Sequence, residues 1–250
     1  MRDYLTIEKD NIRFKIHLRN LTLVLIGSII IADSFVILSD PHSREAVDII
    51  VLDVTGAIAL GLGILVIYRH KFHGVYGKSF FCLTLGVLLW LAADITVSYY
   101  YFILLIKEVP PPVSFADVFW LAGYVFFALH LFITSKFMRN IINVRVVVTS
   151  IASAIFVSYM LTAHLPLILS QFAHHHYLVF AVNVSYPIAD AILIVPAVTI
   201  VVASRLDYEH SIPCSFAAIS LLVNAFADYG FVSDVIITIW KILGFGIYSL

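Results

Sequence analysis

The sequence predicts an all-α fold, a polytopic integral membrane helical bundle of about eight transmembrane helices. Of the 250 residues, 62% are hydrophobic and 12% are charged, and the mean hydropathy is +1.01. A soluble domain is roughly half apolar and a quarter charged, so one soluble core could not bury this much apolar surface. Each of eight apolar runs is close to the roughly 20 residues that a membrane-spanning helix needs. The runs cover residues 21–38, 49–68, 80–106, 118–134, 146–169, 178–202, 214–231 and 235–250.

Basic residues predict the orientation of these helices, because Lys and Arg are retained on the cytoplasmic side of a membrane. With the N-terminus inside, twelve of them fall in cytoplasmic segments and two, Arg44 and Lys107, in outer loops. Residues 1–20 then form a cytoplasmic basic segment, and residues 21–250 form the transmembrane domain. We expect a multi-pass cell-membrane protein that is surrounded by the lipid bilayer and has both termini in the cytoplasm.

Carboxylates inside or at the ends of the apolar runs are the main candidates for a functional site. A charge in hydrocarbon costs several kcal/mol unless it is neutralised, paired or facing a cavity. We predict that the acids and two tyrosines line a polar pocket that opens outward and binds a small ligand or cation. In the alternative interpretation, the acids cap helix starts and pair with tyrosines to hold the bundle together. The candidate residues are Asp53, Asp94, Asp117, Asp190, Asp228, Tyr124 and Tyr186.

Two pairs of these acids recur at similar spacing along the chain. Asp53 and Asp94 are 41 residues apart, and Asp190 and Asp228 are 38 apart. This spacing predicts a parallel repeat of two four-helix halves, an arrangement that some transporters use. The repeat would place Asp94 and Asp190 on facing helices of the two halves.

Lysine and histidine residues suggest two further sites. Lys241 lies within the last apolar run, and we expect it to form an ion pair with Asp234. Three consecutive histidines in an outer loop are candidates for a metal site, although adjacent side chains converge poorly on one ion and a solvated polar loop is the alternative. These histidines are His174, His175 and His176.

Signals for enzymatic activity or nucleic-acid binding are missing from the sequence. It contains no paired-histidine zinc motif, no nucleophile elbow and no glycine-rich phosphate loop. The formal net charge of -1 gives no sign of a nucleic-acid partner. We therefore expect no enzyme activity, no cofactor and no nucleic acid.

Two stretches resemble a known family. Residues 86–127 include Leu-Trp-Leu at 89–91, Asp94, Tyr-Tyr-Tyr at 99–101 and Ser-Phe-Ala-Asp-Val-Phe-Trp-Leu-Ala-Gly-Tyr at 114–124. This stretch is similar to the eight-helix membrane input region that precedes diguanylate cyclase and histidine kinase modules. Ser-Tyr-Pro-Ile-Ala-Asp at 185–190 resembles the same family's second motif. Asp234 and Trp240 depart from the pattern, because they are six residues apart where the first half has a spacing of three.

The resemblance implies a sensory, signal-transducing module. No catalytic module follows Leu250, so we expect any output to pass through a membrane or cytoplasmic signalling protein partner or to lie in a longer parent chain, if there is an output at all. Two other functions stay open: a proton- or cation-coupled transporter, and a structural subunit of a larger membrane complex. The transporter would be expected to have broken helices in both halves, whereas Pro187 and Pro196 interrupt only the sixth run.

The predicted topology can be tested with reporter fusions. We expect fusions at Phe72, Lys136 and Asp207 to report the cytoplasm, because each follows a basic inner segment. Fusions at His42, Val109 and His175 should report the outer side. A single reversed loop would contradict the count of eight helices.

Overall fold

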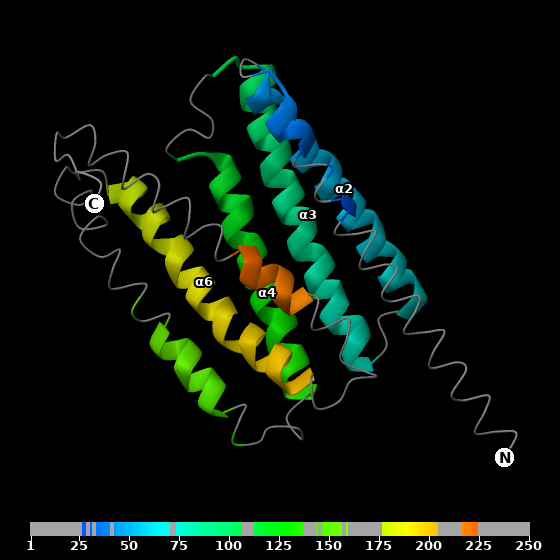
Figure 1. Ribbon diagram of the computed structural model, residues 1–250, viewed down its shortest axis with the longest axis vertical. Helices are drawn as coiled ribbons and strands as arrows, with labels where there is room; N and C mark the ends of the chain where they lie inside the picture. The colour runs from blue at the N-terminus through cyan, green and yellow to red at the C-terminus, as the bar shows by residue number, and fades with distance from the viewer. Residues whose placement is uncertain are drawn as a thin grey trace, which may run out of the picture. The chain divides into compact units, whose positions relative to one another are not determined.

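The computed structural model describes four long helices and shorter helical pieces, with no strand among the described residues. The long helices are α2 (Arg44–His70), α3 (Gly74–Phe102), α4 (Phe115–Phe137) and α6 (Tyr177–Ser204), shown in Figure 1. The contacts divide the chain into two compact units, Met1–Thr55 and Gly56–Leu250. The structure describes residues 27–28, 31, 34–40, 43–70, 74–106, 113–137, 144, 147–156, 159, 177–204 and 217–224.

The four long helices match four of the predicted runs, 49–68, 80–106, 118–134 and 178–202. Each is long and apolar enough to cross a membrane. For three other runs the structure describes parts: helical residues between 27 and 38, the short apolar helix Val147–Phe156, and helical residues 217–224. Run 235–250 lies outside the described residues. The count of eight helices and the repeat therefore stay predictions, while the all-α class and four of the apolar spans are confirmed in the part of the chain that the structure describes.

The helix α3 is offset from the predicted run, about 80–106, at both ends. The helix α3 begins earlier, at Gly74, and ends at Phe102. The chain then turns, with Leu105 in the left-handed region at φ 53° and the Ile106 N–H donating to the Tyr100 carbonyl at 3.1 Å. Residues 103–106 are apolar, so hydropathy could not reveal a turn that the backbone geometry sets.

In the first unit, a short helical stretch over residues 34–38 precedes the start of α2. The guanidinium of Arg44 donates a hydrogen bond to the Ile37 carbonyl at 3.1 Å. The Ser43 carbonyl accepts from the Val47 N–H at 2.9 Å and so begins the hydrogen bonding of α2. A basic side chain thus satisfies a carbonyl at the end of one helical stretch while it occupies the first position of the next helix.

The second unit contains a close contact between α3 and α4, which run antiparallel. A Cβ on Gly86 would lie 2.4 Å from the Phe127 ring, and one on Gly123 would lie 2.4 Å from the Trp90 ring. On α3, Trp90 follows Gly86 by four residues and covers Gly123 of α4. On α4, Phe127 follows Gly123 by four residues and covers Gly86 of α3. The two rings meet edge to face, with centroids 4.9 Å apart. We call these four residues the glycine–aromatic contact.

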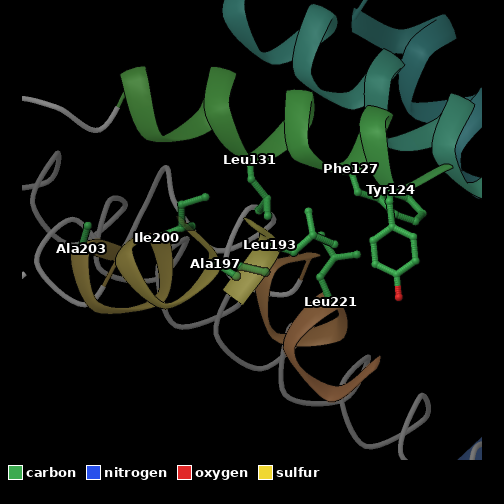
Figure 2. Packing of buried hydrophobic residues seen from close by; sticks show 9 residues of the cluster. Tyr124, Phe127, Leu131, Leu193, Ala197, Ile200, Ala203 and Leu221 are labelled. Atoms are coloured by element: carbon green, nitrogen blue, oxygen red, sulfur yellow. The ribbon is translucent and has the colours of Figure 1, made fainter. Parts of the chain in front are cut away.

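On its other side, α4 packs against α6 through a buried apolar cluster that also includes residues from 217–224. Figure 2 shows α4 side chains meeting those of α6, with Leu221 beside them. Leu131, Ala197, Ile200 and Ala218 are 0% exposed, so the cluster excludes solvent and lipid completely at these positions. The helix α4 therefore lies between α3 and α6 and has extensive contacts with both (Figure 1). The cluster comprises Tyr124, Phe127, Leu131, Leu193, Ala197, Ile200, Ala203, Ala218 and Leu221.

We expect Gly86→Ala to lower the free energy of unfolding by about 1–3 kcal/mol, because the new methyl group must displace the buried Phe127 ring. Gly61→Ala is the matched control, since a Cβ at Gly61 meets no atom within 4 Å. It should leave stability unchanged or raise it by about 0.5–1 kcal/mol, because alanine favours helix. Melting temperatures in detergent would measure both. Equal effects at the two glycines would contradict the contact.

Candidate functional site

Three aspartates and three aromatic side chains from α3, α4 and α6 are joined by hydrogen bonds. All three aspartates, Asp94, Asp117 and Asp190, are among the residues predicted for the pocket, as are both tyrosines. Asp117, Asp190 and Tyr124 are buried, and the other three are half-buried. We call this group the polar layer. It comprises Asp94, Asp117, Trp120, Tyr124, Tyr186 and Asp190.

Asp117 lies in the first turn of α4, where it has two roles. Its Oδ2 accepts hydrogen bonds from the Ser114 N–H at 2.7 Å and from the Ser114 hydroxyl at 3.3 Å. The Ala116 N–H donates to the Ser114 hydroxyl oxygen at 3.2 Å, which completes a reciprocal cap of the helix start. Its Oδ1 accepts from the Tyr186 hydroxyl of α6 at 2.7 Å. The carboxylate therefore caps α4 and also ties it to α6.

A second bond of the same kind lies further along the two helices. The Tyr124 hydroxyl of α4 donates to Oδ1 of Asp190 on α6 at 2.8 Å. In the first pair α6 donates the hydrogen bond to an acid on α4, and in the second pair α4 donates to an acid on α6. The Tyr124 and Tyr186 rings meet edge-on, with centroids 6.2 Å apart. From the first pair to the second, the residue number rises on α4, from 117 to 124, and also on α6, from 186 to 190. The two helices therefore run parallel.

Asp94 on α3 joins the layer through tryptophan. The Trp120 ring N–H donates to Oδ1 of Asp94 at 3.2 Å. The Trp90 ring N–H in turn donates to the Trp120 carbonyl at 3.1 Å, and the Trp90 ring meets Tyr124 edge-on at 5.5 Å. Thus Trp90 takes part both in the glycine–aromatic contact and in holding the residue that binds Asp94.

The layer presents carboxylate oxygens to neutral donors. All three donors around Asp117 are uncharged: a backbone N–H, a serine hydroxyl and a tyrosine hydroxyl. Hydrogen bonds to an ionised acceptor are stronger than neutral ones, and they help to offset the cost of burying the charge. A cation that approached such a carboxylate would compete with the hydroxyl groups for its oxygens. The arrangement therefore places hydrogen-bonded carboxyl groups among three helices.

The structure describes only one of the other predicted site residues. Asp53 is half-buried on α2 in the first unit. Asp228, Asp234, Lys241 and the three consecutive histidines lie outside the described residues, so the ion pair and the metal site stay predictions. Within the part of the chain that the structure describes, no three His, Cys, Asp or Glu side chains are grouped to hold a metal ion.

Sequence reasoning missed the role of Trp120 in the layer and the bonds that Trp90 and Ser114 make to layer residues. A signal for two of them was present in the printed sequence. Ser114 and Asp117 have the spacing of a capping box, and Trp120 lies one helical turn after Asp117. The bond from Trp120 to Asp94 joins residues 26 apart on different helices, and no local pattern indicates it.

No known protein family, curated protein or solved structure matches the chain. The resemblance to a sensor input region therefore stays a prediction.

We expect Tyr124→Phe to lower the free energy of unfolding by about 1 kcal/mol, the size of a hydrogen bond between membrane helices. The ring is kept and the hydroxyl that donates to Asp190 is lost. Tyr99→Phe is the control, because Tyr99 is 50% exposed. In a double-mutant cycle with Asp190→Ala, the effect of Tyr124→Phe should shrink to nearly zero. An undiminished effect would contradict the bond.

Proposed function

We propose that the chain is a membrane sensory module in which the polar layer recognises a cation or a small polar ligand. The two alternating Tyr–Asp bonds between α4 and α6 carry this proposal. Carboxylates buried among apolar helices are expensive, and they commonly mark ligand, ion or proton sites. Here the acids link three helices, so a change in their hydrogen bonds would alter the packing of each helix.

Exchange of hydrogen-bond partners would couple binding to helix packing. A cation that takes Oδ1 of Asp190 competes with the Tyr124 hydroxyl, which links α4 to that carboxylate. Loss of this bond weakens the α4–α6 contact on one side, while the apolar cluster beyond it stays packed. A ligand can shift an equilibrium between two packings only by its difference in affinity for them, and this competition supplies such a difference.

The distribution of basic residues supports an outward position for the layer. Asp117 is in the first turn of α4, and Lys136 is in the last turn of the same helix. Under the positive-inside rule, the end with Lys136 faces the cytoplasm and the end with Asp117 faces outward. A sensor with this orientation would bind its ligand on the outer side.

A transporter coupled to protons or cations is the second candidate. The prolines interrupt only one helix of the pair that a transporter would use, and the observation in its favour is the backbone around Pro187 in α6. Pro187 has no N–H, so the carbonyl of residue 183 loses its usual helical partner. That carbonyl lies two turns before Asp190, on the same face of the helix. Carbonyls released by such interruptions coordinate cations in some transporters, and this one lies on the helix face that carries Asp190. Uptake of a labelled cation into vesicles by the wild type, abolished in Asp190→Asn, would favour transport.

Melting temperatures with sodium, calcium or choline at equal ionic strength test the proposal. A cation whose concentration is about 100 times its Kd for the folded state adds about 2.7 kcal/mol to the free energy of unfolding. We expect at least one of the three to raise the melting temperature of the wild type. Asp190→Asn should abolish the increase, because the amide keeps the size and removes the charge. Tyr124→Phe should keep or enlarge it, because the competing hydroxyl is gone.

Tyr99→Phe is the control and should respond as the wild type does. If none of the three cations shifts the melting temperature, or if Asp190→Asn responds as strongly as the wild type, the layer is structural. In that case Asp94→Asn and Asp190→Asn would lower stability without any change in cation response.

A further inference from the structure

A second buried polar cluster joins α3 and α4 near the opposite end of α4 from Asp117. It consists of Ser79 on α3 and His130 and Thr134 on α4, which are 2%, 0% and 3% exposed. The Ser79 hydroxyl lies 2.8 Å from Nδ1 of His130 and 2.8 Å from the Thr134 hydroxyl. The Phe80 ring covers the imidazole, with centroids 5.9 Å apart.

The contacts of His130 determine which ring nitrogen carries the proton. Nδ1 lies 3.0 Å from the Ser79 backbone carbonyl, which can only accept a hydrogen bond. Nδ1 must therefore be the N–H in the neutral ring, because two lone pairs would otherwise face each other. This assignment leaves Nε2 with a lone pair.

Nε2 is completely buried and has no hydrogen-bond partner in the part of the chain that the structure describes. An added proton would turn it into a charged N–H with no acceptor. Burying an unpaired charge of this kind is strongly unfavourable. The closed contact between α3 and α4 therefore holds the ring only in its neutral form.

The charged and titratable groups near the cluster would not favour a charged ring. On α3, Lys78 is exposed beside Ser79, and Cys82 and Tyr76 are half-buried; on α4, Lys136 is exposed. In α6 from Leu193 onward and in residues 217–224 the sequence has no titratable side chain. The nearby charges are thus positive, and they oppose a second positive charge.

We propose that His130 is a proton-binding site that couples the packing of α3 and α4 to pH on the side of the membrane opposite the polar layer. At neutral pH the ring is neutral and the helices are closed around it. When the pH falls, proton uptake at Nε2 requires the helices to separate enough to hydrate the new charge. Acid therefore favours an opened packing, since that state binds the proton more readily. The proposal does not depend on the polar layer having a ligand.

Thermal unfolding in detergent between about pH 8 and about pH 5 tests this site, because the interval brackets the ordinary pKa of histidine, about 6.5. We expect the melting temperature of the wild type to fall by about 4–8 °C more than that of His130→Asn. Asparagine can keep the donor to the Ser79 carbonyl and cannot take up the second proton. Tyr99→Phe, at a half-exposed position on α3, is the control and should show the full fall of the wild type.

Two further measurements keep the proposal testable if His130→Asn does not fold. His130→Gln is a second non-titrating variant with the same expected loss of pH dependence. In the wild type, nitrogen NMR of labelled histidine should show a buried ring that is protonated at Nδ1 and not at Nε2 at neutral pH. An equal pH dependence in the wild type and in either variant would overturn the proposal, as would a ring protonated at Nε2 at neutral pH.

Discussion

The close approach of α3 and α4 at Gly86 and Gly123 is the constraint on which both polar sites depend. Without side chains at these two positions, the Phe127 and Trp90 rings can each lie on the backbone of the other helix. This packing sets the antiparallel register of the two helices. Toward one end the register brings Trp120 to Asp94, and toward the other it brings His130 to Ser79. A shift of one turn along either helix would break both sets of bonds together.

The helix α4 connects these contacts to the rest of the second unit. One of its faces holds the glycine–aromatic contact, and another holds the apolar cluster with α6. The Tyr–Asp bonds continue this second interface toward the start of α4, where apolar packing gives way to hydrogen bonds. Apolar packing is non-directional, whereas the bonds fix the relative positions of α4 and α6 along their axes. Removing or replacing a bond at one end can therefore change the α4–α6 packing.

The sequence predicted the long helices well, because a run of about 20 apolar residues is a strong signal for a membrane helix. Three acids and two tyrosines that it singled out lie in the polar layer, since a carboxylate in an apolar segment is conspicuous. It could not predict which tyrosine bonds which acid, because those pairs join residues more than 60 positions apart. Nor could it identify the buried role of His130, which depends on the register between two helices. The end of α3 was missed because apolar residues continue beyond the helix.

Accessibility of the layer from outside tests the central claim most directly. In a background with Cys82→Ala and Cys214→Ala, Asp94→Cys and Asp190→Cys would each provide one thiol for a cationic reagent that cannot cross the membrane. If the layer is a ligand site that opens outward, both thiols should react when the reagent is added outside and should be protected when it is added inside. Thiols that react from neither side, or only from the cytoplasmic side, would contradict this account.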